Sequence, residues 1–450
     1  MPITSLRFTN VGPFDDVEFE FDEQVNVFTG PNNSGKSTAL WVLGELLVWP
    51  FEVPVKLYRG PDAEFELRGR TGRQQRKLVG KLPTNFGKGT WTGDSGQRYF
   101  GFILDLGYTN FLPALRRSTD FRSEGPKSER AAPSGETVGQ RLEAALLSTD
   151  PSIVAELERR AALVSTDPSM VSDEVIVQKL IELDYRAYRR DQPSIRQLID
   201  KIAAVASNIT EGFPMEFRGI GEDKNGLFPQ FRTPDGDVPL NVLSQGTQSI
   251  IQWLAHFLIG YAQYYDYPPN LEDKPGIFII DEIDAHLHPS WQRRIIPTLI
   301  QHFPNLQIFC STHSPLMLAG LKQGQVQLLR RDEKRRVTVS RNETDIIGWS
   351  ADEILRNFLA VPSPTDLQTS THIERLQELR RKEDISAEES EELERLRRTV
   401  NQDLSGGPIA GMVERISDVL RGAKAFTPPQ PEPLASTKPK SPRRRRRLSQ

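Results

Sequence analysis

The sequence is almost without cysteine: Cys310 is the only one in 450 residues. A single thiol excludes a disulfide framework within the chain and suits a reducing compartment, so we expect a cytoplasmic protein. No run of about 18 or more apolar residues occurs, so we expect no transmembrane helix. The N-terminus also lacks the basic and then apolar pattern of a secretory signal. These absences argue against a transporter whose membrane domain is fused to its catalytic part.

Charge is nearly balanced over the chain but is unevenly distributed. The formal net charge is −3, yet residues 425–450 carry seven Lys and Arg residues against Glu432 alone, together with six prolines. Such a composition cannot bury a core, so we predict a disordered basic tail. Two interpretations stay open: the tail binds nucleic acid or an acidic partner through its charge, or it is a solvated end without a role.

A glycine-rich segment near the N-terminus fits the phosphate-binding loop, with Gly, four residues and then Gly-Lys-Ser. Residues 25–28 before it read as a strand, and apolar residues follow at helical spacing up to residue 47. The glycines let backbone N–H groups face phosphates, and the helix N-terminus adds positive charge. Lys36 is predicted to reach the β- and γ-phosphates. The predicted ATP-binding residues here are Gly30, Pro31, Asn32, Asn33, Ser34, Gly35, Lys36, Ser37 and Thr38.

A second segment, residues 277–282, ends in two carboxylates. Its first four residues are apolar without interruption, which is typical of a central parallel strand. Carboxylates at the end of such a strand are costly unless they meet a metal or water. Asp281 is therefore predicted to bind Mg²⁺ together with Ser37, and Glu282 to polarise the attacking water. The alternative is a strand that ends at a solvated acidic turn.

Three later segments and the N-terminus resemble a known group of ATPases. Residues 243–248, Leu-Ser-Gln-Gly-Thr-Gln, resemble the signature motif of ABC-type ATPases. Residues 284–289 resemble the segment after Walker B in the OLD and RecF-like branch, and residues 311–315 resemble the switch-histidine segment of that branch. Residues 5–14 resemble the first strand and turn of RecF and SMC heads. The resemblance covers roughly residues 1–50 and 205–345.

The resemblance implies an ATP site that two copies of the chain complete together. Ser244 and Gly246 of one copy would contact the γ-phosphate bound by the other, and Gln248, which closes the signature, is counted with these nucleotide-binding residues. Asp284 would lie at the dimer seam. His313, expected on a further strand, would sense the γ-phosphate and join Lys36 and Glu282 as a catalytic residue. Gln97 is the nearest candidate for the glutamine loop that such ATPases use.

His286 and His288 allow a different interpretation, because a His-x-His pair can bind zinc. No third ligand is evident near them in the sequence. The alternative is that both are polar turn residues before a helix that starts at Pro289.

The patterns predict an α/β fold: an ABC-type P-loop head with a mixed sheet flanked by helices, a helical insert and a helical C-terminal extension. Residues 214–240 read as a hairpin with its turn at Asp235-Gly236, and residues 346–424 include a charged helical hairpin with a capping box from Ser386 to Glu389. The expected regions are 1–110 (first ATPase lobe, with the P-loop), 111–208 (loop and helical insert), 209–345 (second lobe, with signature, Walker B and switch histidine), 346–424 (helical) and 425–450 (basic tail).

The predicted function is an ATP-binding and ATP-hydrolysing switch or clamp that dimerises on ATP and Mg²⁺. The chain resembles stand-alone ATPases of bacterial phage-defence modules such as the Septu and PARIS types, which implies a separately encoded nuclease or toxin as partner. One alternative is a RecF-like repair ATPase with DNA as its partner, which the acidic body of the chain disfavours. The other is the ATP subunit of a separate membrane transporter, which Gln245 in the signature and the long insert disfavour.

Overall fold

The computed structural model describes residues 2–48, 63–71, 74–81, 90–93, 108–112, 173–190, 192–224, 226–359, 361, 366–382 and 386–405. The chain divides into two compact units, Met1–Pro362 and Ser363–Gln450, and each is considered by itself. The predictions for the loop within 113–172, for Gln97 and for the basic tail lie outside the described residues. None of the helices in the described ranges is both long and apolar enough to cross a membrane.

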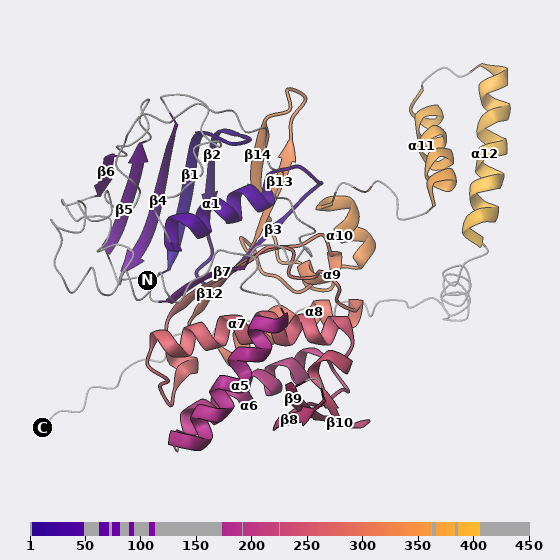
Figure 1. The fold of residues 1–450 in the computed structure, drawn as a ribbon. Coiled ribbons are helices and arrows are strands. Elements are labelled where there is room, and N and C mark those ends of the chain that lie inside the picture. Colours follow the sequence, from indigo (N-terminus) through magenta and orange to yellow (C-terminus); the bar gives the residue numbers. More distant parts are fainter. Residues whose placement is uncertain are drawn as a thin grey trace, which may run out of the picture. The chain divides into compact units, whose positions relative to one another are not determined.

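A six-stranded mixed sheet forms the centre of the first unit (Figure 1). Its strand order is β14-β13-β3-β12-β11-β7, and every neighbouring pair is parallel except β13 with β14. This sheet and the helices on its two faces confirm the predicted fold class. The strands are β3 (Val25–Thr29), β7 (Tyr108–Leu112), β11 (Gly276–Ile280), β12 (Leu306–Ser311), β13 (Val326–Arg331) and β14 (Val337–Arg341).

The central strands are buried on both faces, as an uninterrupted apolar run requires. Along β11, Ile277 and Ile279 pack in a core that includes α1 (Lys36–Val48), whereas Phe278 and Ile280 pack in the core that holds the helices of the opposite face. This alternation follows from the two-residue period of a strand. The helices of the opposite face are α5 (Asp173–Arg190), α6 (Pro193–Ile209), α7 (Gln245–Tyr264) and α8 (Pro289–His302).

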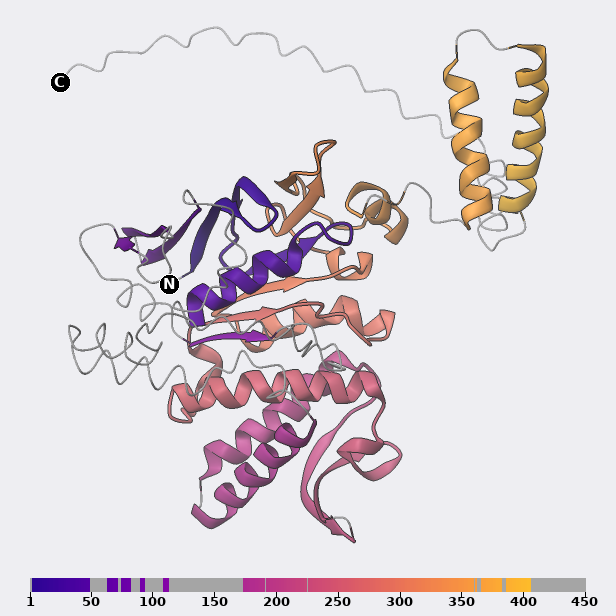
Figure 2. The ribbon, with the colours of Figure 1, turned by 45° about the horizontal axis from the view of Figure 1, so that its top comes forward.

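A second, antiparallel sheet covers the other side of α1 (Figures 1 and 2). Val17 and Phe19 of β2 are buried in the core that they share with α1, while Glu18 and Glu20 are exposed, as the sequence alternation predicts. The helix α1 is therefore enclosed between two sheets, which explains why its apolar residues are not confined to one face. The strands, in sheet order, are β2 (Phe14–Glu20), β1 (Ile3–Val11), β4 (Glu64–Thr71), β5 (Gln74–Lys81) and β6 (Thr90–Gly93).

The prediction of a single hairpin at residues 214–240 is wrong in its extent. The segment forms three antiparallel strands, β8 (Glu216–Asp223), β9 (Gly226–Thr233) and β10 (Gly236–Pro239). The turn before Gly236 joins β9 to β10, because Gly236 pairs with Thr233. A second reversal, after which Gly226 begins β9 with a φ of +125°, joins β8 to β9 and was not predicted. Two short 3-10 helices, η4 (Leu240–Val242) and η5 (Leu271–Asp273), flank α7.

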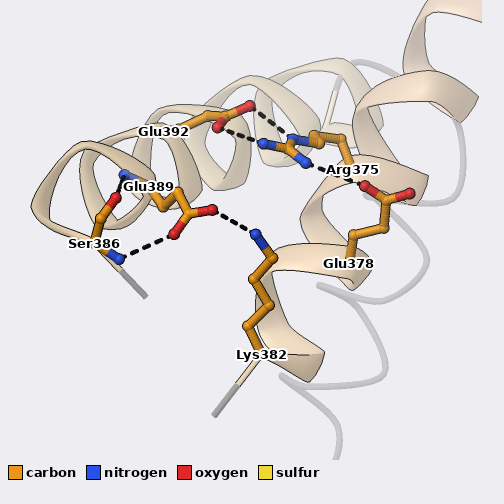
Figure 3. Close-up of polar contacts among 6 residues, drawn as sticks. All are labelled: Arg375, Glu378, Lys382, Ser386, Glu389 and Glu392. Carbon is orange, nitrogen blue, oxygen red and sulfur yellow. Dashed lines mark hydrogen bonds and ion pairs between the residues drawn. The ribbon is translucent and has the colours of Figure 1, made fainter. Parts of the chain in front are cut away.

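Two further helices, α9 (Pro315–Leu318) and α10 (Ala351–Asn357), belong to the first unit. The described part of the second unit is a helical hairpin, α11 (Leu367–Arg381) and α12 (Ala387–Ser405). Ser386 and Glu389 form the predicted capping box, with N–H to oxygen distances of 3.0 and 3.2 Å (Figure 3). Arg375 bridges from α11 to Glu392 of α12, and the seam buries Leu379. The predicted charged hairpin is therefore confirmed.

Candidate nucleotide-binding site

A cavity of about 330 Å³ opens where β3, β11 and β12 end. The carboxyl ends of parallel strands meet at one edge of a sheet, which is where open α/β folds bind their ligands. The structure thus brings residues that are more than 270 positions apart around one space. The lining residues are Asn32, Asn33, Gly35, Lys36, Ser37, Thr38, Glu282, Ser311 and His313.

The backbone of the loop after β3 takes a conformation that requires glycine at two positions. Gly30 has a φ of +138°, and a Cβ placed on it would lie 2.1 Å from the carbonyl oxygen of Leu329 on β13. Gly35 has a φ of +101°, and its Cβ would lie 3.1 Å from the rings of Pro13 and Phe14. Asn33 between them has a φ of +61°. The loop therefore packs closely against β13 at Gly30 and against the β1–β2 turn at Gly35.

Lys36, the first residue of α1, is buried within this loop. Its Nζ donates to the carbonyl oxygens of Gly30 and Pro31, each at 3.0 Å. Burial lowers the pKa of Lys36, while the nearby carboxylates Asp281 and Glu282 act to raise it. The ammonium group lines the cavity together with the N-terminus of α1, and both features favour an anion there.

Ser311, the last residue of β12, joins the two predicted carboxylates. Its hydroxyl donates to Asp281 Oδ1, and its Oγ accepts from the backbone N–H of Glu282 at 2.8 Å. Glu282 has a φ of +53°, a left-handed conformation that costs a residue with a Cβ about 1–2 kcal/mol. Ser311 therefore helps to hold Glu282 in a strained conformation beside the cavity. Asp281 itself is buried and lies behind Ser311 rather than on the cavity wall.

The sequence interpretation placed Ser311 in the switch-histidine segment but gave it no role. The signal that could have found it is the strand register: Ile280 pairs with Cys310, so the next residues, Asp281 and Ser311, lie side by side. That register depends on pairing across some 30 positions of the chain, and the local pattern of neither segment specifies it.

The expectation that His313 lies on a strand is wrong, because β12 ends at Ser311 and His313 follows two residues later. The strand stops where its neighbours β3 and β11 stop, and Ser314 then caps α9 by accepting from the N–H of Leu316 at 3.1 Å. The exposed imidazole lines the cavity. Partial burial and the nearby Lys36 lower the pKa of His313, while the carboxylates of Asp284, Glu282 and Asp281 act to raise it.

Asp284, expected at a dimer seam, directs its carboxylate towards the switch segment of its own chain. Among the described residues, Asp284 Oδ1 is buried without a hydrogen-bond partner. Burial raises the pKa of Asp284, while the neighbouring Thr312 side chain and His313 act to lower it. The turn after Glu282 and the segment that carries His313 are thus connected within one chain.

The signature residues do not line this cavity, within the part of the chain that the structure describes. Ser244 is exposed at the N-terminus of α7, where its Oγ accepts from the N–H of Thr247 at 3.2 Å. Gly246 is buried, and a Cβ on it would lie 3.0 Å from both the carbonyl oxygen of His286 and the Trp291 ring. The Gln248 side chain donates to the carbonyl oxygens of Leu243 and Asn241, which fixes the entry to the helix.

The donor atoms fit Mg²⁺ and zinc differently. Ser37 on the cavity wall and Asp281 behind Ser311 offer hard oxygen donors, which suit Mg²⁺ bound through one or two protein oxygens and substrate phosphates. For zinc, the described residues contain no group of three or more His, Cys, Asp and Glu side chains that could hold a metal ion. His288 instead caps α8, since its Nδ1 accepts from the N–H of Ser290 at 3.2 Å.

Ser311→Ala is expected to lower ATP turnover about 10- to 100-fold while the KM for ATP changes about threefold or less, because positioning is lost at Glu282 and not in the phosphate-binding loop. Steady-state ATPase assays on this variant and on Ser340→Ala, an exposed serine of β14, provide the measurement and its control. Equal turnover in the two variants would remove the bridging role of Ser311.

Comparison with known proteins places the site within a described group. Residues 25–319 match the family model described as "AAA domain, putative AbiEii toxin, Type IV TA system". The Septu protein PtuA of Bacillus thuringiensis is 31% identical over 152 residues, which are 32% of this chain and 38% of that protein. The Retron Ec83 probable ATPase of Escherichia coli is 39% identical over 100 residues, 22% of this chain and 18% of that protein. The aligned segments thus span well under half the length of these relatives.

Among solved structures, the SMC head domain from Thermotoga maritima superimposes with a TM-score of 0.42 at 14% sequence identity, and the alignment covers 76% of this chain and 100% of that domain.

Proposed function

Because the chain belongs to the family described as "AAA domain, putative AbiEii toxin, Type IV TA system", we propose that it binds and hydrolyses ATP at the cavity formed by the loop after β3, Glu282, Ser311 and His313. The observation that carries this proposal is the convergence of three separated segments on one cavity that offers a cation, a carboxylate and an imidazole. These are the groups that phosphoryl transfer to water uses.

Each group has a distinct part in the proposed reaction. Lys36 and the loop N–H groups hold the β- and γ-phosphates, and Ser37 and Asp281 would hold Mg²⁺, which would supply charge that neutralises the phosphates. Glu282 accepts a proton from water as the water oxygen bonds to the γ-phosphorus. The bond from that phosphorus to the bridging oxygen breaks and leaves ADP and phosphate. His313 donates a hydrogen bond to a γ-phosphate oxygen.

We further propose that the signature of a second copy completes the site. Ser244 is exposed at a helix N-terminus, which favours an anion, yet it does not line the cavity of its own chain. A second copy could supply this N-terminus to the γ-phosphate and exclude water at the same time. ATP would then hold two copies together, and hydrolysis would release them.

Mixing two inactive variants tests whether the site is shared. Lys36→Ala removes the phosphate-binding cation, and Ser244→Arg blocks the signature of the same chain. A mixed dimer contains one site with an intact Lys36 from one copy and an intact Ser244 from the other. Because neither variant alone has an intact site to hold two copies together, every dimer in an equal mixture is mixed and has one working site of two, so we expect up to about half of wild-type turnover if the sites act independently.

Each variant alone is expected to be inactive in the same ATPase assay. A mixture that stays as inactive as its components would show that no site is shared between copies, while a fully active Ser244→Arg variant would show that the signature takes no part in turnover.

We propose that the biological role is antiviral defence together with a separately encoded effector, a nuclease or a toxin. The support is the relationship to a Septu protein and a retron ATPase, and the proposal concerns the whole protein rather than the aligned segments. Co-expression with the product of the neighbouring gene is expected to give a complex that elutes together in gel filtration. Two products that elute separately, both with and without ATP, would contradict the partnership.

A further inference from the structure

The first turn of α8 contains a glutamine whose side chain joins two segments of the candidate site. The hydroxyl of Ser314 donates to Gln292 Oε1 at 2.6 Å, and Gln292 Nε2 donates to the carbonyl oxygen of Leu287 at 3.0 Å. The amide therefore uses its acceptor towards one segment and its donor towards the other. Only an amide of this length offers both groups on one planar end.

Each partner of Gln292 is itself fixed to a residue of the site. Ser314 follows His313 directly, and its backbone N–H donates to the hydroxyl of Thr312 at 2.9 Å. The N–H of Leu287 donates to the carbonyl oxygen of Asp284 at 3.2 Å, which closes the turn that Glu282 begins. Ser314 is buried, so replacement of the amide by an apolar group would leave its hydroxyl without this acceptor.

The residue before Gln292 contacts a different motif. The Trp291 ring lies 3.0 Å from the place where a Cβ on Gly246 would stand, so it packs under the signature. Two adjacent side chains of one helical turn thus contact two motifs: Gln292 contacts the switch segment of its own site, and Trp291 contacts the signature.

We propose that Gln292 is a positioning residue for hydrolysis that holds the His313 segment against the Asp284 turn, an inference that rests on the proposed ATPase function. It is not among the described residues that line the cavity, and its side-chain hydrogen bonds go to Ser314 and Leu287, so it acts on turnover and not on nucleotide affinity. It acts in the copy that owns the phosphate-binding loop. Trp291, in contrast, supports the signature of its own copy and therefore acts on the ATP site whose phosphate-binding loop belongs to the other copy.

The first test is a separation of kcat from KM. Gln292→Leu is expected to lower kcat about tenfold with KM for ATP within about threefold of wild type, since misplacement of a catalytic group affects the chemical step. Gln292→Glu retains an acceptor for Ser314 but places a carboxylate oxygen, which cannot donate, against the Leu287 carbonyl. A loss of kcat with unchanged KM is therefore also expected, and this variant serves if Gln292→Leu does not fold. Wild-type kcat in either folded variant would overturn the proposal.

The second test assigns the effect to one copy of the chain. In the mixture of Lys36→Ala with Ser244→Arg, the Ser244→Arg copy owns the working phosphate-binding loop. Gln292→Leu on that copy is expected to lower turnover about tenfold, and on the Lys36→Ala copy to leave it within about twofold. Trp291→Leu is expected to show the reverse: a loss of turnover on the Lys36→Ala copy, which provides the intact signature, and little change on the Ser244→Arg copy. A loss of equal size on both copies would reveal a general structural role and overturn positioning.

The two proposals fail in distinguishable ways. If the starting mixture is inactive, the shared site is wrong, and the kcat of the single Gln292 variants still decides the positioning role. If the wild-type protein hydrolyses ATP and the mixture is active, the shared site stands. The second test then decides whether Gln292 acts in the copy that provides the phosphate-binding loop.

Discussion

Glu282→Gln is expected to lower ATP turnover about 100- to 1,000-fold, because an amide of the same shape cannot accept the proton of the attacking water. Affinity for ATP is expected to stay within about threefold of wild type, since Lys36 and the loop after β3 keep their contacts. Steady-state turnover and the affinity for a fluorescent ATP analogue measure the two quantities separately.

Glu343→Gln serves as the matched control, because Glu343 is an exposed glutamate beyond β14. That variant is expected to keep wild-type turnover. If Glu282→Gln retained turnover within about tenfold of wild type, the general-base role would belong to another group. A joint loss of affinity and turnover would instead indicate that Glu282 shapes the site and does not act on water.

Gly30→Ala is expected to abolish measurable nucleotide binding and to lower the free energy of unfolding by about 3–5 kcal/mol. A Cβ at this position would lie 2.1 Å from the carbonyl oxygen of Leu329, a backbone atom of a paired strand that cannot turn aside. Either β13 or the loop after β3 must move, and Lys36 loses its anchor on the Gly30 carbonyl if the loop does. Denaturant unfolding and nucleotide titration measure the two effects.

Gly212→Ala separates the steric overlap from the cost of the backbone conformation alone. Gly212 has a φ of +81°, but a Cβ placed on it would meet nothing within 4 Å. We expect this control to cost only about 1 kcal/mol and to bind ATP normally. Equal stability losses in the two variants, with nucleotide binding intact in both, would mean that contact with β13 does not shape the loop.

Much of this architecture could be predicted from the sequence because the determining signals are local. The order of strand, glycine-rich loop and apolar helix predicts the loop around Lys36, and the structure has β3 and α1 at those places. Similarly, a run of apolar residues after the signature predicts α7, whose N-terminus is capped by Ser244. The family model that matches residues 25–319 spans all of these segments.

The remainder depends on contacts between segments that are distant in the chain. Ser311 meets Asp281 because β12 pairs with β11 in one register, and a shift by a single residue would turn its side chain to the other face. His313 leaves the strand because the neighbouring strands end and α9 begins at Pro315. The link through Gln292 requires α8, the switch segment and the Asp284 turn to be packed together, which no periodicity within α8 reveals.

If ATP joins two copies of the chain through the signature, the mass of Glu282→Gln in solution must depend on ATP. Light scattering in ATP and Mg²⁺ is predicted to give twice the chain mass of 50.9 kDa, and ADP or the added change Ser244→Arg is predicted to return it to a single chain. A mass that remains that of one chain while ATP is shown to be bound would contradict the account.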